Sequence, residues 1–315
     1  MKKKLFNLLC CVIVVLLTLG TALFMGHFLD PLGTGDSINS IKAFHMLPEN
    51  SVDVMMFGTS HTWKGCDTNV LYDEYGISAY NYGGNWQAFN TTFLFMEDAF
   101  RTQKPKVVCI DTYVVDSYLQ DVDMDGQIYY TRAISNFPGK KRFLKDCFGN
   151  RLGRYVSYYF PISVFHDNWT CITKENFYDA RTKEDYLSTR GYEPLEGTRS
   201  FILDDYKTFK KSALSEKAVS LLDEVVELCR ENGTEVIFYT APYYGEYEYF
   251  DAMKEYASKH DCAYLNLFEL VDEMGFDPMT DFSDSQHVNT SGARKIGLFL
   301  GKYIRENYDI PDCRN

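Results

Sequence analysis

Two short polar stretches, one near each end of the chain, combine side chains that can move a proton and attack a carbonyl carbon. Ser60 stands two residues after Gly58, directly behind an apolar stretch at 52–57. His287 lies in a polar loop, and Asp284, three residues earlier, can accept a hydrogen bond from one imidazole nitrogen. The other nitrogen can then take the proton of a serine hydroxyl, which makes that serine a nucleophile. Ser60 and His287 together predict acyl-transfer chemistry.

Each half of this pair also has a structural interpretation. Serine is among the commonest helix N-caps, and a chain with 6 histidines places some of them in loops. Position in the fold favours the chemical interpretation, because Ser60 follows the first predicted strand and His287 follows the last. The carboxyl ends of parallel strands share one edge of a sheet, so the two side chains are expected to converge there. Backbone N–H groups at the turn after the first strand suit the oxyanion of an attacked carbonyl.

The sheet itself is predicted from an alternation of short apolar runs with amphipathic stretches. Strands are expected at 52–57, 79–82, 106–113, 235–240 and 263–267. Helices are expected at 60–74, 90–102, 213–231, 247–259 and 291–307. Strands that alternate with helices are typical of a parallel, doubly wound sheet. The predicted fold class is therefore α/β, a three-layer doubly wound parallel sheet.

Residues 114–211 interrupt this alternation and are unusually aromatic. A structureless loop of that length is uncommon in a compact domain, so the interval is predicted to form an inserted cap with short helices of its own. Its aromatic side chains either pack the cap onto the sheet or line a groove for sugar rings or acyl chains over Ser60. The predicted organisation is a linker, at 33–36, and a first helix within 27–50, followed by an α/β domain at 51–315.

The chain begins with a candidate membrane anchor. Lys2, Lys3 and Lys4 precede an apolar run that extends to about Met25. A helix that crosses the hydrocarbon core needs about 20 apolar residues, and positive charge stays on the cytoplasmic side. A cleaved signal peptide is the alternative, but it has a shorter apolar core and small residues at its cleavage site. Residues 1–26 are therefore predicted to be an uncleaved anchor, a single pass that places the C-terminal domain outside the cytoplasm.

Charge and cysteine content weigh against several other functions. The chain has 32 basic and 44 acidic side chains, a net charge of -12, and the part beyond the three anchor lysines carries -15. Nucleic-acid binding normally needs a basic surface, so that role is disfavoured. The sequence has no C-x-x-C spacing, phosphate-binding glycine loop or metal-ligand cluster, and neither a cofactor nor a metal is expected. A disulfide between Cys147 and Cys171 is left open.

The order and spacing of these residues resemble the SGNH (GDSL-like) hydrolase family, in the membrane-anchored branch found at bacterial surfaces. The family's Gly-x-Ser nucleophile turn is matched at 58–60, and its D-x-x-H-x-N-x-x-G block is matched at 284–292. The resemblance covers most of the chain beyond the anchor, apart from the aromatic interval. It implies a flavodoxin-like SGNH fold in which Ser60 is the nucleophile, His287 is the general base and acid, and Asp284 orients His287.

The two middle blocks of the family are matched less closely. Relatives have a glycine whose N–H joins the oxyanion hole at the position that Trp86 holds here. Two replacements are open for this donor: Gly84 takes the place of the glycine, or the N–H of Trp86 still serves. A second donor is expected from the side chain of Asn85 or of Gln87. Relatives also have an asparagine after the third strand, whereas this strand ends in residues 111–113, Asp-Thr-Tyr. Losing one oxyanion donor typically lowers the rate by about 10²- to 10³-fold. The altered blocks therefore leave open an enzyme that is slow, specialised or inactive.

The remaining pocket residues are predicted from their places after the strands. The candidates that follow the second and third strands are Trp86, Gln87 and Tyr113. Tyr243 and Tyr244, after the fourth strand, are expected to flank the pocket. His61 is expected to be structural, because adjacent helix positions do not share a face with the nucleophile.

The expected function is an extracytoplasmic serine esterase or O-acyltransferase that acts on acyl esters, acetyl esters above all, of cell-envelope glycans. Hydrolysis and transfer share the same acyl-enzyme, so the sequence does not separate them. The resemblance also implies a membrane-bound O-acyltransferase as the partner that supplies acyl groups. The alternative is a catalytically silent surface module that keeps the fold to bind glycan or that membrane partner, which the altered middle blocks and the aromatic cap motivate.

Overall fold

The computed structural model describes residues 2–30, 36–118, 128, 130–177 and 181–314, so most of the predicted linker at 33–36 lies outside the described residues. A single sheet of five parallel strands forms the centre of the α/β body, in the order β2-β1-β3-β4-β5. This order is the one found in flavodoxin-like doubly wound sheets. The strands lie within the predicted ranges, at β1 Val54–Phe57, β2 Ala79–Asn81, β3 Val107–Asp111, β4 Glu235–Thr240 and β5 Ala263–Asn266.

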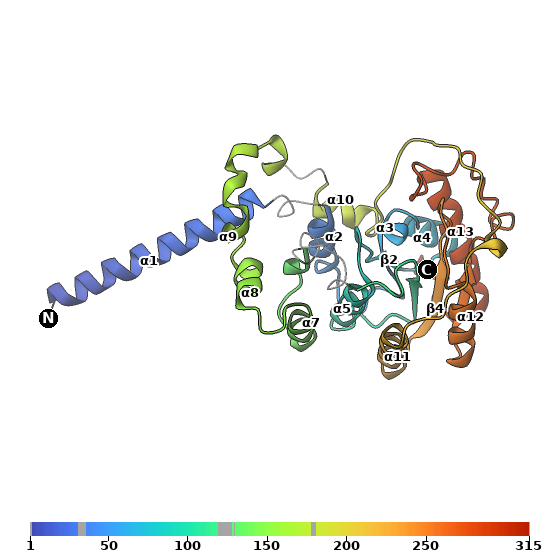
Figure 1. Ribbon diagram of the computed structural model, residues 1–315, viewed down its shortest axis with the longest axis horizontal. Helices are drawn as coiled ribbons and strands as arrows, with labels where there is room; N and C mark the ends of the chain where they lie inside the picture. The colour runs from blue at the N-terminus through green and yellow to red at the C-terminus, as the bar shows by residue number, and fades with distance from the viewer. Residues whose placement is uncertain (1, 31–35, 119–127, 129, 178–180, 315) are drawn as a thin grey trace.

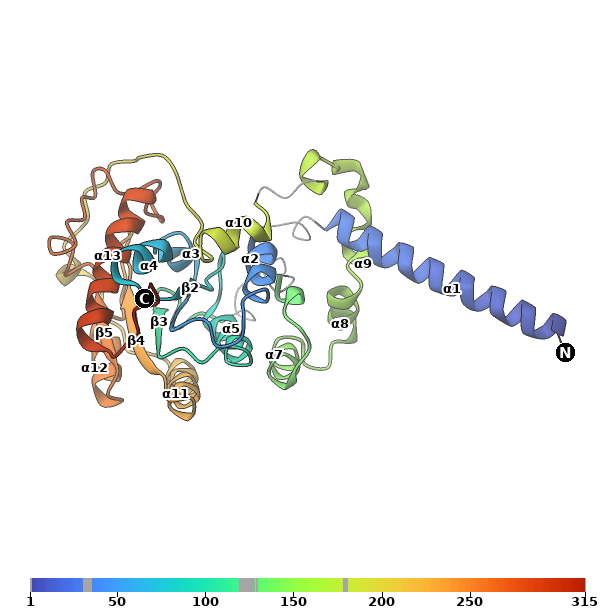
Figure 2. The same cartoon turned by 180° about the vertical axis from the view of Figure 1, so that it is seen from behind.

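Helices cover both faces of the sheet, which confirms the predicted α/β class (Figures 1 and 2). Along β1, Met55 and Phe57 join one buried apolar cluster, and Val54 and Met56 join another on the opposite face. This alternation explains why the strands read as continuous apolar runs, since both faces are buried. The first face carries α2 Asp36–Phe44, α5 Phe89–Ala99, α11 Glu216–Glu231 and α12 Phe250–Lys259, and the second carries α4 Thr68–Tyr75 and α13 Thr290–Asn307.

The single helix predicted at 60–74 is wrong, because the structure has two helices there. α3 covers Ser60–Trp63 and ends at Lys64, and α4 begins after Asp67. The side chain of Asp67 accepts a hydrogen bond from the backbone N–H of Asn69 at 3.1 Å and so acts as a new N-cap. The break leaves Ser60 on a short helix of its own at the end of β1.

The aromatic interval forms short helices, but its described aromatic residues do not cover Ser60. Its elements are α7 Pro138–Phe148, α8 Leu152–Tyr159, α9 Ile162–Phe165, α10 Lys183–Ser188 and four 3-10 turns, η1 Thr131–Ala133, η2 His166–Cys171, η3 Lys174–Asn176 and η4 Tyr206–Thr208. α7 packs on α5, and α9 packs on the N-terminal helix α1 Lys2–Leu29 (Figure 1). Tyr158 is fully buried in the cluster on the first face of the sheet. Within this packing Cys147 is buried and Cys171 is exposed, and both are free thiols.

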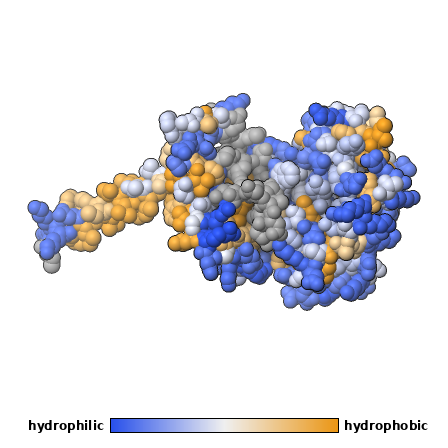
Figure 3. Space-filling view, in the orientation of Figure 1, coloured by the Kyte–Doolittle hydropathy of each residue, from blue (hydrophilic) through white to orange (hydrophobic). Residues whose placement is uncertain are grey.

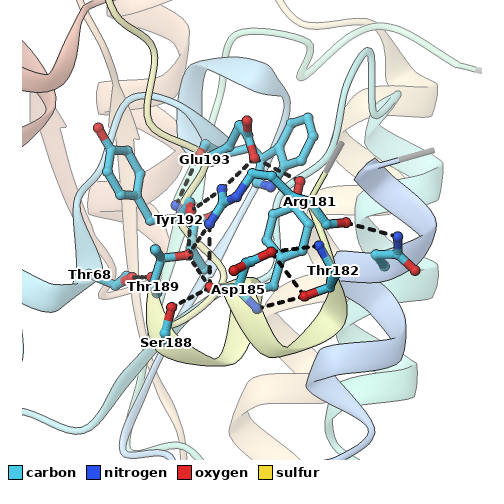
Figure 4. Close-up of polar contacts among 12 residues, drawn as sticks. Thr68, Arg181, Thr182, Asp185, Ser188, Thr189, Tyr192 and Glu193 are labelled. Carbon is cyan, nitrogen blue, oxygen red and sulfur yellow. Dashed lines mark hydrogen bonds and ion pairs between the residues drawn. The ribbon is translucent and has the colours of Figure 1, made fainter. Parts of the chain in front are cut away.

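The interval returns to the α/β body through a polar network around α10 (Figure 4). The hydroxyl of Thr182 accepts from the backbone N–H of Asp185 at 3.3 Å, and the Asp185 carboxylate accepts from the N–H of Thr182 at 2.8 Å. This reciprocal capping box satisfies N–H groups that the first turn of a helix leaves unpaired. Arg181 forms an ion pair with Glu193 at 2.5 Å, and Thr68 of α4 donates to the carbonyl of Arg190 at 2.9 Å. Together with the packing of α10 on α2, these contacts fix the end of the interval beside α4.

Within the part of the chain that the structure describes, a single helix, α1, is both long enough and apolar enough to cross a membrane. It has 28 residues, and its apolar side chains are exposed along most of its length (Figure 3). Gly26 and Leu29, near its C-terminal end, are buried against the rest of the protein. The α/β body is thus connected to this apolar helix by a packed junction.

Candidate active site

The predicted serine, histidine and aspartate meet at the carboxyl edge of the sheet. The hydroxyl oxygen of Ser60 lies 2.9 Å from Nε2 of His287. Nδ1 of His287 lies 2.9 Å from Oδ2 of Asp284 and 3.0 Å from Oδ1. The two ends of the chain, separated by the whole sheet in sequence, thus form one continuous hydrogen-bonded chain. Its geometry is that of a nucleophile, a base and a group that orients the base.

Ser60 is held at the tip of β1 by its neighbours in the turn. Gly58 adopts a φ of 148°, which side chains other than hydrogen rarely allow. A Cβ at Gly58 would lie 2.4 Å from the hydroxyl of Thr62 and 2.7 Å from Cβ of Asp111. Thr59 accepts from the N–H of His61 at 3.2 Å and donates to Oδ2 of Asp111 at 3.3 Å. The turn therefore has one conformation, and that conformation points Ser60 toward His287.

Gly58→Ala is expected to lower the free energy of unfolding by roughly 2–4 kcal/mol. The alanine would have to adopt a φ that it disfavours, and its Cβ would clash with neighbouring atoms. A cost of this size would lower Tm by roughly 5–10 °C in a domain of this length. Gly275→Ala is the matched control, since Gly275 also has a positive φ, 61°, but a Cβ there would have no heavy atom within 4 Å. Thermal unfolding of the full chain in detergent micelles tests this, and equal Tm losses for the two variants would contradict it.

The loop that carries His287 is closed by backbone pairing and anchored to α13. Phe282 and Val288 form an antiparallel bridge, and the N–H of Ser283 donates to the carbonyl of His287 at 2.9 Å. Asn289 caps α13 by accepting from the N–H of Gly292 at 3.1 Å. Gly292 is required by close packing, because a Cβ there would lie 2.5 Å from the carbonyl oxygen of Asp281. The asparagine and glycine of the matched block thus hold the loop rather than face the pocket.

Asp284 is kept ionised by the groups that surround its carboxylate. Partial burial alone would raise its pKa, but hydrogen bonds from the His287 side chain and from the backbone N–H groups of Gln286 and His287 outweigh burial and lower that pKa. The two backbone bonds to Oδ1 measure 2.8 and 2.9 Å. A carboxylate held in this way fixes the orientation of the imidazole and stabilises the imidazolium that forms when His287 accepts a proton.

A pocket of about 730 Å³ opens over Ser60 and is lined by loops that follow the strands. Tyr113 stacks on His61 with ring centroids 3.9 Å apart, and its hydroxyl donates to Oε1 of Gln286 at 3.2 Å. Tyr243 packs edge-on against Tyr113 with ring centroids 5.0 Å apart. Further lining residues are Lys64, Asn85, Trp86, Asp116, Ser117, Glu246, Tyr247, Glu248 and Tyr249. The volume is within the usual range for small-molecule sites.

The structure places the five candidates of the middle blocks differently. Asn85, Trp86 and Tyr113 line the pocket, as predicted, and Trp86 is 65% exposed at its mouth. Gln87 is a correction, because its side chain is fully buried beneath the turn and donates to the hydroxyl of Thr92 at 3.3 Å. Gly84 is a second correction, because its N–H donates to the carbonyl of Gly58 at 3.1 Å and is therefore not available to an oxyanion.

Several donors at the pocket have no intramolecular acceptor among the described residues. They include the backbone N–H groups of Ser60, Asn85 and Trp86 and the side-chain amide of Asn85, and all three residues line the pocket. An oxyanion hole requires donors that are fixed in place and not already engaged. The N–H groups of Ser60, Asn85 and Trp86 and the side chain of Asn85 are therefore candidates for stabilising a tetrahedral intermediate.

His61 is buried and neutral rather than a second base. Burial, with a smaller contribution from the charge of His287, lowers the pKa of His61 to about 3, although Asp284 acts in the opposite direction. Its ring lies in the pocket wall, with a centroid 5.8 Å from that of His287. The prediction that His61 is structural agrees with its burial, but its place in the wall was not predicted. Tyr244 does not line the pocket, and instead stacks on Phe201 with centroids 4.9 Å apart.

Asp111, at the carboxyl end of β3, contacts the turn that carries Ser60, and sequence reasoning treated it only as a departure from the asparagine block. Burial raises the pKa of its carboxyl to about 7, and hydrogen bonds from Tyr113, Thr59 and Ala241 act in the opposite direction. The carboxyl is fully buried behind the Ser60 turn. A buried carboxyl at the end of a central strand has no sequence signature of its own, because its burial depends on the loops that fold over it.

The raised pKa of Asp111 predicts a stability that depends on pH. The carboxyl of an aspartate in an unfolded chain has a pKa of about 3.9. Between about pH 4 and pH 7, Asp111 is therefore protonated in the native state and ionised in the unfolded state. The stabilising contribution is thus complete below about pH 4 and is lost as the pH rises through 7, with a maximal slope of about 1.4 kcal/mol per pH unit. Asp111→Asn should flatten this slope. Urea unfolding of both proteins at several pH values tests it, and parallel pH profiles would contradict it.

Tyrosines and carboxylates of the loop after β4 form the largest group of pocket residues that sequence analysis missed, beside Lys64, Asp116 and Ser117. Tyr247, Tyr249, Glu246 and Glu248 all line the pocket. The available signal was the rule that residues beyond the carboxyl ends of the strands gather at one edge, which applies to this loop as it does to Tyr243. Across the residues that the structure describes, no group of three or more His, Cys, Asp or Glu side chains is arranged to hold a metal ion.

Comparison with known proteins adds no assignment to this geometry. No family model matches the chain, and no curated protein matches it. The functional argument therefore depends on the residues and distances described above.

Proposed function

We propose that the protein is a serine esterase or O-acyltransferase of the SGNH (GDSL-like) type. The observation that carries the proposal is the hydrogen-bonded chain from Ser60 through His287 to Asp284, with distances of 2.9 Å at both links. A flavodoxin-like strand order with the nucleophile after β1 and the histidine after the last strand supports the same family. The interval at 114–211 contributes Val114, Asp116 and Ser117 to the pocket lining, whereas its described aromatic helices pack elsewhere.

In the proposed reaction, the hydroxyl oxygen of Ser60 attacks the carbonyl carbon of an ester while Nε2 of His287 takes the hydroxyl proton. The negative charge that develops on the carbonyl oxygen is stabilised by the N–H of Ser60 and by Asn85. The bond to the leaving alcohol then breaks, and His287 returns the proton to that alcohol. Water or a sugar hydroxyl next gives its proton to His287 and attacks the acyl carbon of the acyl-enzyme. The bond from that carbon to the Ser60 oxygen then breaks, His287 returns the proton to this oxygen, and an acid or a new ester is released.

The shape of the pocket supports a small acyl group on a larger polar molecule. The pocket is open at Trp86, while the tyrosine rings of Tyr113 and Tyr243 form the wall near the nucleophile. Aromatic rings with polar edges suit sugar rings, which present both apolar faces and hydroxyl groups. We therefore propose acyl esters of cell-envelope glycans, with acetyl as the favoured acyl group, as the substrates.

The N-terminal helix supports a place at the cell membrane. α1 has the length and apolarity of a single membrane-spanning helix, and three lysines precede its apolar run. Because lysines favour the cytoplasmic side, the α/β body is proposed to lie outside the cytoplasm. A membrane-bound O-acyltransferase is the proposed partner, since an enzyme in that location has no supply of activated acyl groups of its own.

Turnover of an aryl acetate by the full chain in detergent tests the proposal. Release of the aryl alcohol with a burst equal to the enzyme concentration is expected, since an acyl-enzyme precedes hydrolysis. Addition of an oligosaccharide acceptor distinguishes the two reactions, because an O-acyltransferase forms the acetylated sugar and an esterase forms acetate alone. No turnover, together with retained glycan binding, would contradict the proposal and favour the catalytically silent module.

A further inference from the structure

The segment at 152–177, here called the membrane seat, exposes an unusual set of apolar side chains. It consists of α8, α9, η2 and η3. On α8, Leu152, Val156 and Tyr159 are 74%, 42% and 42% exposed, while Tyr158 on the other side is fully buried. Spacings of four and three residues place the three exposed side chains on one face of the helix. Trp169 and Phe177, each 65% exposed, extend the apolar surface beyond α8.

The membrane seat is joined directly to the end of α1. A Cβ at Gly26 would lie 2.7 Å from the backbone nitrogen of Ile162, so α9 approaches α1 as closely as the missing side chain allows. The side-chain amides of Asn168 and Asn176 donate to the carbonyls of Leu29 and Phe28 at 3.0 and 2.8 Å. These two bonds satisfy carbonyl groups that the last turn of a helix leaves unpaired. The seat is thus packed against the C-terminal end of α1 and hydrogen-bonded to it.

The junction directly follows a stretch of α1 that is long enough to cross the hydrocarbon core. A helix needs about 20 residues to cross the hydrocarbon core, and α1 has 28. Its exposed apolar side chains lie between Leu5 and Phe24, which is about the length required, and packing against the seat begins at Gly26. The seat therefore starts where the span ends. Figure 3 shows hydrophobic surface on α1 and again on the adjoining helical part of the molecule.

The segment that leads into the seat has a charge opposite to that of the whole chain. Residues 138–151 contain five basic side chains and one acidic one, whereas the seat at 152–177 has two of each and the chain as a whole has a net charge of -12. Among the basic ones, Lys141, Lys145, Arg151 and Lys174 are exposed. A polar surface rich in lysine and arginine beside an apolar face is typical of helices that lie in the interface of an anionic bilayer.

We infer that the membrane seat inserts its exposed apolar face into the lipid interface around the end of α1, on anionic phospholipid. Such helices bury their apolar face about 5–10 Å into the boundary between headgroups and acyl chains. The protein then contacts the membrane at two connected places, and the α/β body is held at one height above the surface instead of pivoting on α1. This inference depends on α1 crossing a membrane and is independent of the proposed catalysis.

Fluorescence quenching by lipid tests the inference with a matched control inside the chain. Trp86 and Trp169 are both 65% exposed, but only Trp169 belongs to the seat. The full chain is placed in nanodiscs of three parts phosphatidylcholine to one part phosphatidylglycerol, with some acyl chains brominated near their headgroup end. The emission of each tryptophan is obtained as the difference in fluorescence between the unaltered chain and the variant in which that tryptophan is replaced by phenylalanine. About half of the Trp169 emission should be quenched and the Trp86 emission should be unchanged.

A second variant separates insertion from mere proximity. Val156→Asp with Tyr159→Asp places two charges on the exposed face of α8 and should remove most of the quenching of Trp169. Ile202→Asp with Met279→Asp is the control, since Ile202 and Met279 are 81% and 50% exposed apolar residues outside the seat. Quenching of Trp169 no greater than that of Trp86 would overturn the inference, as would unchanged quenching in the α8 variant. If that variant does not fold, the comparison of the two tryptophans decides.

Discussion

Replacing Ser60 with alanine is expected to lower kcat/KM toward an aryl acetate by about 10⁴-fold or more. The loss is large because the Ser60 hydroxyl forms the covalent bond of the proposed acyl-enzyme, and alanine has no group that can form this bond. His287 contacts this hydroxyl at 2.9 Å, and the turn that carries it is fixed by Gly58 and by the bonds of Thr59. Initial-rate kinetics on the purified full chain provide the measurement.

The control for this prediction is a serine away from the pocket. Ser220 lies on the exposed side of α11, so Ser220→Ala should retain full kcat/KM. Tm of both variants should remain close to that of the unaltered protein, since Ser60 is only partly buried. Retention of more than a tenth of the activity in Ser60→Ala would mean that the ester is cleaved elsewhere and would remove Ser60 from the mechanism.

His287→Ala is expected to reduce kcat/KM to a similar extent, about 10⁴-fold or more, because Ser60 then has no base to accept its proton. Residues that act as a unit are strongly non-additive. The Ser60→Ala, His287→Ala double variant should therefore be no slower than Ser60→Ala alone, within about threefold. The four proteins of this double-mutant cycle are compared by initial rates on the same ester.

Multiplication of the two losses in the double variant would contradict a shared mechanism. The effect of Asp284 provides an internal check, because Asp284 acts only through His287, at 2.9 Å from Nδ1. Asp284→Asn should cost less than His287→Ala, as the orienting member of such a trio does elsewhere. A larger loss for Asp284→Asn would indicate that the carboxylate has a direct role.

The sequence predicted the sheet and the serine, histidine and aspartate because their signals are local. Strands buried on both faces appear as continuous apolar runs, and β4 was predicted at 235–240, where the structure has Glu235–Thr240. The convergence of Ser60 and His287 followed from the parallel sheet, since the ends of its strands share an edge. For the same reason Tyr113 and Trp86 were correctly placed at the pocket.

The predictions that failed depended on contacts between distant residues. Gly84 was expected to bind an oxyanion, but its N–H donates to the carbonyl of Gly58, a partner in another strand-end turn. Gln87 was expected in the pocket but is buried beneath its own turn. For the aromatic interval the sequence left two places open, packing on the sheet or lining a groove over Ser60, and its described helices pack on α5 and α1. Aromatic composition predicts burial or contact without saying against which surface.

Labelling with a fluorophosphonate tests the central claim most directly, because this reagent reacts preferentially with a serine that an adjacent base activates. The full chain, in detergent, is incubated with the reagent, and the adduct is located by mass spectrometry of the intact protein and of its peptides. We expect one adduct per chain, on Ser60, and none in His287→Ala. An unlabelled Ser60 in folded protein, or an adduct that persists in His287→Ala, would contradict the claim that Ser60 and His287 form a working nucleophile and base.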